Sequence, residues 1–340
     1  MSADTDSPLV SVVIPCRNEV KSIRSTVLAI LAGDYQNLEI LVVDGMSEDG
    51  TRAELEKLSQ EDSRVRMIDN PNKKTPYAFN LGVVNARGEF VQIVGSRNVL
   101  ASNYISILMY NLETQPDVAC VGGDFQHVSD TPSGEYLAQA MESKFGVGFG
   151  NYRTMQQNAY VDTVGIPMYR RSIFSDVGLF DENLTRNQDD DFNFRVRAKG
   201  YKILYVHAAK ATYLVRASYK KAFHQFSQYG YFKVFVNRKH KAVTTMRQLV
   251  PPVFVLVWLV GLPLSLFSLT VASFLSTLAF VYIVLGLFMS TSVGSVMDRL
   301  YVTFNCAILH FGYGWGYLRG VWDFLVVHRP PSESFQRQTL

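Results

Sequence analysis

The sequence is poor in cysteine and nearly balanced in charge, and each shortage argues against a class of protein. Its 340 residues include only 3 cysteines, which are far apart in the chain: Cys16, Cys120 and Cys306. So few and scattered cysteines argue against a disulfide framework and a zinc site, and they suit a reducing compartment. The formal net charge is +3 at pH 7, which gives no reason to expect a nucleic-acid partner.

The chain also lacks an apolar N-terminal stretch and the glycine pattern of dinucleotide-binding proteins. Residues 1–8 are polar and acidic, so we expect a flexible N-terminus that stays in the cytosol, without a signal peptide. The absence of a Gly-x-Gly-x-x-Gly motif after any predicted strand argues against a dinucleotide fingerprint. A length of 340 residues is long for one compact domain, so we expect a domain with additional elements.

The first half of the chain alternates apolar strands with helical segments. β-branched apolar runs, typical of buried parallel strands, occupy residues 9–15, 39–44, 64–69 and 89–94. Helical spacing of apolar residues lies between them, over residues 18–31, 51–59 and 76–86. This order predicts an α/β fold with a Rossmann-like, doubly wound and mostly parallel sheet. Ligands of such sheets collect beyond the carboxyl ends of the strands.

Polar residues follow these strands at the expected ligand-binding edge. The segments are Pro15-Cys16-Arg17-Asn18-Glu19, Asp44-Gly45-Met46-Ser47-Glu48-Asp49-Gly50-Thr51 and Gly95-Ser96-Arg97-Asn98. An acid at a strand end, such as Asp44, suits the ribose or base edge of a nucleotide. Lys74 precedes the next helix and can reach a base or phosphate, although loop lysines are usually only solvated. Asp124 closes a further apolar strand and can line a donor sugar.

A cluster of three acids, Asp189, Asp190 and Asp191, is the most unusual feature of the sequence. Neighbouring carboxylates repel one another, which raises the proton affinity of at least one of them, as a general base near neutral pH requires. A purely structural role also fits, because acids at a helix start complement the helix dipole and Asp191 can pair with Arg195 four residues later. The residues alone leave both interpretations open.

The motifs together resemble family-2 inverting glycosyltransferases of GT-A fold. The matching segments are residues 11–19, 42–51, 78–82, 86–90, 164–171 and 177–182, followed by the acid cluster and Arg195. The resemblance covers roughly residues 9–240 and is nearest to bacterial membrane-bound enzymes of exopolysaccharide assembly. It implies a catalytic domain over residues 9–216 that moves a sugar, with inversion, from a nucleotide-diphosphate sugar to a hydroxyl of a lipid-linked or saccharide acceptor.

The resemblance also implies roles for individual residues. Family members place a Glu-Asp pair six residues before an arginine, and its Asp accepts the proton of the acceptor hydroxyl. Here the pair reads Gln188-Asp189, so Asp189 is the implied base and Asp191 a supporting acid. Gln188 and Asp190 are expected to shape the acceptor site. Contacts to the nucleotide sugar are expected from Pro15, Arg17, Asn18, Glu19, Asp44, Lys74 and Asp124.

One departure from the family is large, because its metal-binding Asp-x-Asp motif is replaced by Gly95-Ser96-Arg97. The departing diphosphate gains negative charge and needs an electrophilic partner. In one explanation Arg97 neutralises it as a bidentate donor. In a second, a divalent metal (Mg or Mn) is held by other residues, of which the candidates are Asp44, Asp124, Asp189 and His207. In a third, the domain is a catalytically silent subunit that binds nucleotide sugar or a partner synthase. We expect an active enzyme, with no cofactor certain.

Residues 217–247 are rich in aromatic and basic side chains, as suits a helix in the lipid headgroup layer. A helix buried against the catalytic domain is the alternative. The segment includes Gln225, at the position where processive synthases of the wider family carry Gln-x-x-Arg-Trp. The arginine is missing here, which argues against a processive polymerase. Gln225 itself is expected near the acceptor.

The stretch from Gln248 to Met297 contains no charged side chain, and it predicts a transmembrane helical hairpin over residues 248–297. The two spans are expected near residues 252–269 and 271–290, with a tight turn at 268–273. Basic residues flank it on both sides: Lys239, Lys241, Arg247 and Arg299. The positive-inside rule therefore predicts a multi-pass protein of the inner (cytoplasmic) membrane whose catalytic domain faces the cytosol.

Residues 298–329 are expected to form a third membrane-associated segment. Its glycines at 312, 314, 316 and 320 favour close packing against another helix, and an interfacial or re-entrant element fits equally well. The tail, residues 330–340, is polar and is expected to be flexible.

Overall fold

The computed structural model describes residues 7–148, 152–215, 218–243, 246–290 and 294–336. It divides into an α/β unit, Met1–Gln126 with Met155–Leu214, and a helical unit, His127–Thr154 with Val215–Thr339. The catalytic domain expected over residues 9–216 is therefore interrupted, because residues 127–154 pack with the helical unit. There the Tyr136 hydroxyl donates to Asp298 Oδ1 at 2.6 Å, and its ring stacks on that of Tyr301 at 5.0 Å.

The α/β unit is built on a mixed sheet with the strand order β3-β2-β1-β4-β8-β6-β9-β5, in which β7 also pairs with β9. The parallel half consists of β1 (Val10–Cys16), β2 (Leu38–Asp44), β3 (Val65–Asp69) and β4 (Phe90–Ile93). The other half consists of β5 (Asn98–Leu100), β6 (Val118–Val128), β7 (Ala159–Tyr160), β8 (Gly165–Arg170) and β9 (Lys202–Leu214), with antiparallel pairings. The predicted α/β fold and the parallel N-terminal strands are confirmed.

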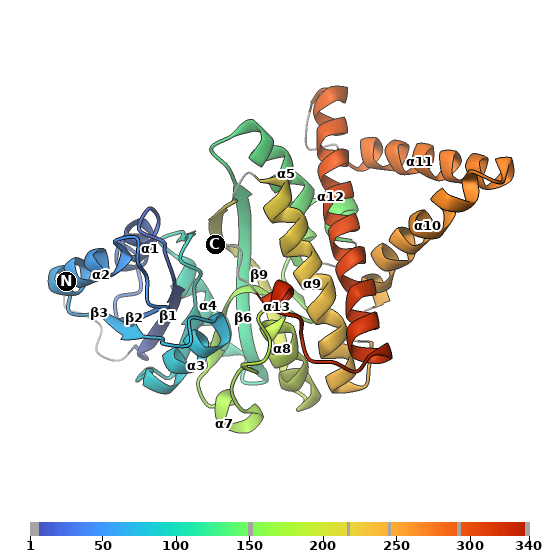
Figure 1. Ribbon diagram of the computed structural model, residues 1–340. Coiled ribbons are helices and arrows are strands. Elements are labelled where there is room, and N and C mark those ends of the chain that lie inside the picture. Colours follow the sequence, from blue (N-terminus) through green and yellow to red (C-terminus); the bar gives the residue numbers. More distant parts are fainter. Residues whose placement is uncertain (1–6, 149–151, 216–217, 244–245, 291–293, 337–340) are drawn as a thin grey trace. The chain divides into compact units, whose positions relative to one another are not determined.

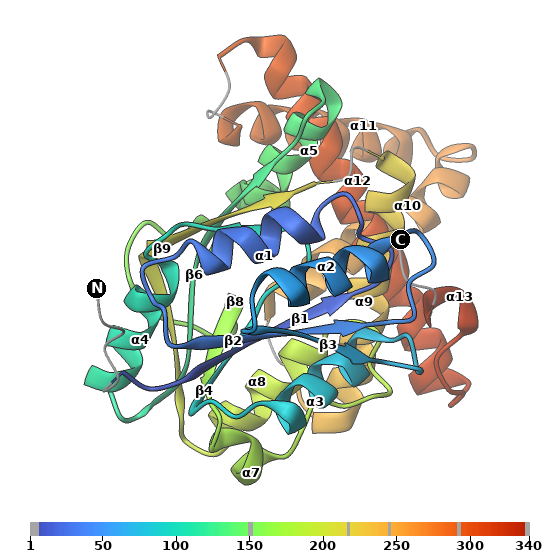
Figure 2. The ribbon, with the colours of Figure 1, turned by 90° about the vertical axis from the view of Figure 1, so that its left-hand side faces the viewer.

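Helices cover both faces of this sheet, and Figure 2 shows α1 and α2 on one side and α3, α7 and α8 on the other. Their bounds, with α4, are α1 (Ile23–Leu31), α2 (Thr51–Glu61), α3 (Thr75–Asn85), α4 (Tyr104–Thr114), α7 (Ile173–Val177) and α8 (Gln188–Ala198). The helix predicted over residues 18–31 begins only at Ile23. Asn18 adopts a left-handed conformation (φ 54°), and the loop that contains it is bonded to the loop after β2.

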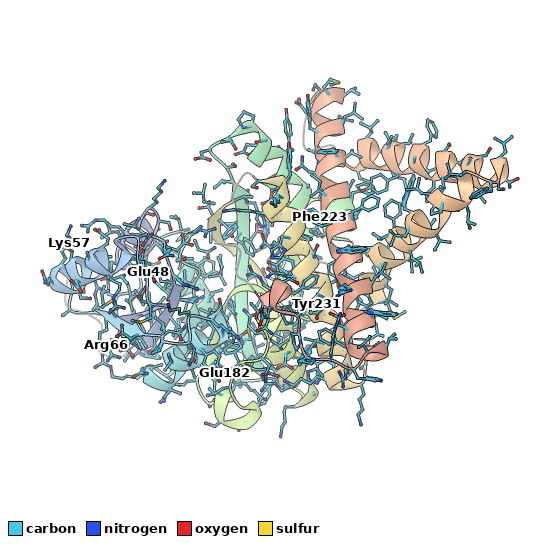
Figure 3. The ribbon with its side chains drawn as sticks, viewed as in Figure 1. Glu48, Lys57, Arg66, Glu182, Phe223 and Tyr231 are labelled. Carbon is cyan, nitrogen blue, oxygen red and sulfur yellow. The ribbon has the colours of Figure 1, made fainter. Side chains whose placement is uncertain are left out.

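Glu39 of β2 is a buried carboxylate that joins neighbouring parts of the sheet. It is 2% exposed and accepts hydrogen bonds from Ser11 Oγ at 2.7 Å, the Arg87 amide at 2.8 Å and Arg66 Nη2 at 3.1 Å (Arg66 is labelled in Figure 3). Burial by itself raises the pKa of this carboxyl. The hydrogen bonds from Arg87 and Ser11 lower the pKa by more, so the net pKa lies below its usual value. The side chain therefore stays charged inside the sheet.

The helical unit contains two long helices that pack against each other along most of their length, α9 (Tyr219–His240) and α12 (Val296–Val321). Its other elements are α5 (Pro132–Glu142), α6 (Lys144–Val147), η1 (Tyr152–Thr154), η2 (Met246–Leu249), α10 (Val250–Ser265), α11 (Leu269–Met289), a π-helical turn over Trp322–Val326 and α13 (Glu333–Gln336).

Glycines at four-residue intervals let α12 approach α9 closely. A Cβ built on Gly316 would lie 1.9 Å from the Ser227 carbonyl oxygen. At Gly312 and Gly320 a Cβ would lie 2.8 Å from the carbonyl oxygens of Phe223 and Tyr231, respectively (both labelled in Figure 3). The close packing predicted from the glycine spacing is confirmed, and it buries the facing side of α9.

Two helical stretches among the described residues are long and apolar enough to cross a membrane, Met246–Ser265 and Leu269–Met289. They correspond to the predicted hairpin, but the turn occupies residues 266–268 instead of 268–273, because Ser268 caps α11 through a bond from the Val271 amide. α12 is not among these stretches.

Residues before the end of the described chain are held on α9, although the sequence predicts a flexible tail over residues 330–340. The Tyr231 ring stacks on Phe335 with centroids 4.0 Å apart, and Gln228 Nε2 donates to the Phe335 carbonyl at 2.8 Å. The Tyr231 hydroxyl also donates to the buried carboxylate of Asp323 at 2.8 Å, and Arg329 pairs with the same carboxylate. Residues 337–340 and 1–6 lie outside the described residues.

We expect Gly316→Ala to lower the thermal stability of the helical unit. The new methyl group meets a backbone carbonyl and forces α9 and α12 apart, which costs roughly 1–3 kcal/mol as overpacking does elsewhere. Thermal unfolding in detergent measures the effect. Gly294→Ala is the matched control, because a Cβ at Gly294 meets nothing within 4 Å. Equal midpoints for the two variants would contradict the packing described.

Candidate active site

The loops after β1 and β2 are bonded to each other at the carboxyl ends of these strands. Asp44 is fully buried and accepts hydrogen bonds from the Ser47 amide at 3.0 Å and Arg52 Nη1 at 2.8 Å. Ser47 Oγ, which also donates to Asp44, accepts from the Asn18 amide at 2.8 Å. Asn18 Oδ1 in turn accepts from the Glu48 amide at 2.9 Å. The side chains of Asp44 and Asn18 therefore hold the two loops together. The sequence predicts that these same side chains contact the nucleotide.

Arg52 is a residue of this edge that sequence reasoning missed. Its Nη1 lies 2.8 Å from both Asp44 Oδ2 and Asp69 Oδ1, so it joins the ends of β2 and β3. A cation in the first turn of a helix is unfavourable next to the positive end of the helix dipole. That position, in the helix that follows the strand-end acid Asp44, is the signal that points to an acidic partner.

Arg97 stands where the family carries the second acid of its metal motif, and it is paired with Glu19. Arg97 Nε donates to Glu19 Oε2 at 2.9 Å, and Nη2 donates to Oε1. Ser22 Oγ also donates to Glu19 Oε2 at 3.1 Å. The two charged side chains are only 15% and 11% exposed, so the pair is a largely buried link between the loops after β4 and β1.

The surroundings keep the Arg97 guanidinium charged. Burial by itself lowers its pKa, but the hydrogen bonds with Glu19 and Tyr213 raise it, and the net pKa is above the ordinary arginine value. Both oxygens of Glu19 are bonded to protein donors. An anion can gain the Nε and Nη2 edge of Arg97 only by displacing this carboxylate.

The residues do not fit a divalent metal in the family's usual place. The motif position supplies a cation instead of carboxylates, and among the described residues no three His, Cys, Asp or Glu side chains form a group that could hold a metal ion. Two of the predicted candidates, Asp124 and His207, do meet, with Oδ2 and Nδ1 3.5 Å apart. The ammonium of Lys210 lies between them, 2.7 Å from Asp124 Oδ2 and 3.2 Å from His207 Nε2.

Arg17, at the end of β1, is a cation with unused donors at the same edge. Its aliphatic stem lies on Gly45, where a Cβ would come within 3.1 Å of Arg17 Cδ. Its Nε is buried and has no hydrogen-bond partner within the described ranges of the chain. Leaving such a donor unsatisfied costs about 1–3 kcal/mol, so this arrangement suits a ligand acceptor.

The three acids at the start of α8 have three different surroundings. Asp191 is fully buried and pairs with Arg195 at 3.1 Å, as the four-residue spacing predicts. Asp190 accepts from Asn187 Nδ2 at 2.9 Å. Asp189 is the exposed member of the cluster, in the first turn of the helix. Its implied role as the base stays a prediction, as does the supporting role of Asp191.

Two side chains fix the loop that leads to these acids. Asn80 of α3 donates through Nδ2 to the Phe180 carbonyl at 3.0 Å and accepts at Oδ1 from the Phe180 amide at 2.9 Å. Arg195 donates to the Leu179 carbonyl at 2.7 Å. The rings of Phe180 and Phe192 stack with centroids 4.5 Å apart. Asn80 belongs to a segment that matches the family, and its contacts give the physical reason for an asparagine there.

A strained backbone lies in β8, which pairs with β4. Ile166 has φ 47°, a left-handed conformation that is unfavourable for a β-branched residue. Its carbonyl accepts from Gln92 Nε2 at 2.8 Å and from the Tyr104 hydroxyl at 3.0 Å, which hold it in place. Sequence reasoning did not identify Gln92 or Tyr104 as supports of this backbone. A polar residue inside a buried strand, such as Gln92, was a usable signal.

The remaining predicted residues lie at separate places. Pro15 is in β1, and Lys74 precedes α3, where its carbonyl accepts from Asn70 Nδ2 at 3.0 Å. Gln225 lies on α9 in the helical unit and donates to the Tyr229 hydroxyl at 2.8 Å. The structure thus brings Glu19 together with Arg97, and Asp124 together with His207.

We expect Glu19 and Arg97 to be strongly coupled in a double-mutant cycle of Glu19→Gln and Arg97→Met. Removing one partner leaves a largely buried charge, so the coupling should reach about 1–3 kcal/mol, below the value for a fully buried pair. Denaturant unfolding of the four proteins measures it. The exposed pair Arg24–Glu61, with 42% and 48% exposure, is the control and should couple far more weakly, because solvent screens it. Additive effects at Glu19 and Arg97 would contradict the link.

Known proteins resemble this chain in sequence. Residues 11–178 match the sequence profile of "Glycosyl transferase family 2". The succinoglycan biosynthesis protein ExoA of Rhizobium meliloti (strain 1021) is 28% identical over 244 residues, which cover 71% of this chain and 73% of the relative. The dolichyl N-acetyl-alpha-D-glucosaminyl phosphate 3-beta-D-2,3-diacetamido-2,3-dideoxy-beta-D-glucuronosyltransferase of Methanococcus voltae is 29% identical over 242 residues, covering 68% and 74%.

Solved structures share the fold. The mannosyltransferase PcManGT from Pyrobaculum calidifontis, in complex with GDP-Man and Mn2+, superposes with a TM-score of 0.65 at 17% identity, over 94% of this chain and 88% of that one. GalNAc-T7 with UDP, GalNAc and Mn2+ gives a TM-score of 0.51 at 16% identity, over 63% and 45%. At such identities the likeness concerns the fold alone.

Proposed function

Because this chain carries a glycosyl transferase family 2 domain over residues 11–178, we propose that it moves a sugar from a nucleotide-diphosphate sugar to an acceptor hydroxyl, with inversion at the anomeric carbon. The acceptor is a saccharide or a lipid-linked glycan, in the synthesis of exopolysaccharide or another cell-surface glycan. The single observation that carries the proposal is the exposed carboxylate of Asp189, presented by a loop that Asn80 and Arg195 hold in place.

Asp189 is the proposed base. As the acceptor oxygen forms its bond to the anomeric carbon and the bond to the diphosphate breaks, Asp189 takes the hydroxyl proton. The start of α8 favours a charged carboxylate at this place. Asn187 Oδ1 and Gln188 Oε1 are buried and lack partners in the described chain, so they suit hydrogen bonds from acceptor hydroxyls. Asp190 keeps Asn187 oriented through its hydrogen bond.

On the donor side we assign the direct contact with the diphosphate to Arg17. Its donors are unused, and a guanidinium fork matches phosphate oxygens. Arg97 acts indirectly, because its Nε and Nη2 are bonded to Glu19. Through Glu19 it fixes the loop after β1, which also contains Arg17. Asp44 and Glu19 contribute by the shape of their loops, since protein donors already occupy their oxygens. Pro15, Asn18, Lys74 and Asp124 complete the proposed nucleotide-sugar site.

The two apolar helices suggest association with a membrane, and the finer arrangement is part of the proposal. Lys239, Lys241, Arg247 and Arg299 flank them, which favours both ends and the catalytic domain on the cytosolic side of the inner membrane. An acceptor linked to a lipid would share that surface. By composition alone, the sequence predicts two full crossings, a multi-pass hairpin.

A catalytically silent subunit is the rival function, and the loss of the Asp-x-Asp acids favours it. It predicts binding of nucleotide without turnover of any nucleotide sugar. An active enzyme predicts transfer or slow hydrolysis of at least one donor by the purified protein. Loss of that turnover on addition of a chelator would mean that residues outside the usual motif hold a metal.

We expect Asp189→Asn to lower kcat by at least about 100-fold, because general-base catalysis contributes 100- to 10,000-fold. Binding of the nucleotide should be unchanged. Asp190→Asn is the matched control, with the same loss of charge one residue away, and should cost far less. Turnover against a panel of nucleotide sugars, with binding measured by calorimetry, separates these effects. Unchanged turnover in Asp189→Asn would sink the assignment of the base.

We expect Arg17→Met to weaken the binding of nucleoside diphosphates by about tenfold or more, as the loss of a charge-assisted contact implies. Binding of the nucleoside without phosphates should stay the same. Calorimetry with UDP and uridine, and with GDP and guanosine, makes the comparison. Arg17→Lys keeps the charge without the fork and should give an intermediate loss. Equal losses for nucleoside and diphosphate would assign Arg17 to the base instead.

A further inference from the structure

The turn between α10 and α11 has an unusual surface for a loop on the far side of a membrane. Leu266, Phe267 and Leu269 are 81%, 88% and 84% exposed, and they stand at the apex where the two helices meet. A hairpin that crosses a bilayer places such a turn in water or among headgroups. Three large apolar side chains are unfavourable there and favourable in hydrocarbon.

Part of the backbone of the turn is paired internally. The amides of Leu266 and Phe267 donate to the carbonyls of Pro263 and Leu264 at 3.3 Å and 3.0 Å. The two nearby hydroxyls are also bonded internally: Ser265 donates to the Leu262 carbonyl at 2.7 Å, and Ser268 accepts from the Val271 amide. Internal pairing of this kind lowers the cost of placing polar groups in lipid.

The length of the shorter arm limits how deep the turn can reach. α10 has 16 residues, which extend about 24 Å at 1.5 Å per residue, against a hydrocarbon core of about 30 Å. The candidate span of 20 residues is reached only by adding the 3-10 turn Met246–Leu249, which contains Arg247. The other arm, α11, is 21 residues long. It begins at the same turn, so the depth that α10 allows also limits that end of α11.

Both arms are apolar on all sides and return to the same helix. Only 17% and 11% of the two candidate spans are buried, so lipid is the natural surrounding for most of their surface. Far from the apex, Tyr282 of α11 contacts His310 of α12 at 2.8 Å between the hydroxyl and Nδ1. Figure 1 shows α11 running across α12 instead of along it, unlike neighbouring helices in a bundle of membrane spans.

We propose that the α10–α11 hairpin is re-entrant: it enters the hydrocarbon layer of the bilayer from one side, turns inside it at residues 266–268, and returns to the same side. Lipid acyl chains surround the apex, and no part of the hairpin reaches the opposite surface. The proposal concerns how the chain meets the membrane and does not depend on the sugar-transfer reaction, so the two fail separately.

Cysteine labelling of the full-length protein in sealed membrane vesicles tests the topology. The native cysteines are all buried, so Phe267→Cys adds one reactive thiol at the apex. We expect no reaction with a membrane-impermeant maleimide from either side, and full reaction after detergent is added. Val243→Cys, at a position 48% exposed ahead of the hairpin, is the control and should react from the cytosolic side.

Labelling of the apex from the opposite side would show a crossing hairpin and overturn the proposal. Labelling from the cytosolic side without detergent would overturn it too, because the apex would then lie outside the bilayer. Protection that persists in detergent would mean that protein, such as a second copy of this chain, covers the apex in place of lipid.

A charge at the apex gives a second, independent measurement. Phe267→Lys should lower the membrane-bound fraction, expressed as a partition ratio, by about 100-fold if the apex lies in hydrocarbon, as translocon scales for a central lysine imply. Val243→Lys, outside the hairpin, should leave the ratio unchanged. Equal partitioning of the two variants would contradict the re-entrant arrangement, because a lysine on a water-exposed turn costs nothing.

Discussion

A carboxylate buried in a protein stays charged only when donors surround it, and the α/β unit depends on meeting that requirement several times. Four of its buried or nearly buried acids are paired with an arginine: Glu39 with Arg87, Asp44 with Arg52, Glu19 with Arg97, and Asp191 with Arg195. Removing one partner of such a pair is far more costly than the pair itself is stabilising. These pairs therefore fix where the strand-end loops lie and give the site its shape.

The same requirement divides the acids of the site into two groups. Acids with arginine partners have a structural role, because their oxygens already accept hydrogen bonds from protein donors. Asp189 is the exposed member of the acid cluster, at the start of a helix whose next two acids are bonded to Asn187 and Arg195. On the donor side the pattern is reversed, because the cation at the metal motif is bonded to Glu19, whereas Arg17 Nε has no hydrogen-bond partner among the described residues.

Local patterns in the sequence predicted the parts of the fold that depend on local forces. The four parallel strands, the pairing of Asp191 with Arg195 and the close approach of α12 to α9 all follow from periodicity or spacing. The partner of Asp44 did not, because Arg52 reaches it through a loop whose course depends on Asn18 and Ser47. The assignment of residues 127–154 to the helical unit was missed for a related reason. It rests on Tyr136 meeting Asp298, 162 residues away in the chain. The docking of the tail likewise depends on Tyr231, which no local pattern near Phe335 reveals.

The glycine contacts of α12 have a consequence for the order in which the protein matures. Gly312, Gly316 and Gly320 are made long after the residues of α9 on which they pack, and the hairpin lies between them in the sequence. At about 5–20 residues per second, α9 waits several seconds on or near the ribosome before its partner exists. During that interval its aromatic face is uncovered and the apolar hairpin has already emerged. The helical unit can therefore close only after the whole apolar hairpin has been synthesised, so the hairpin is free to make other contacts before this unit folds.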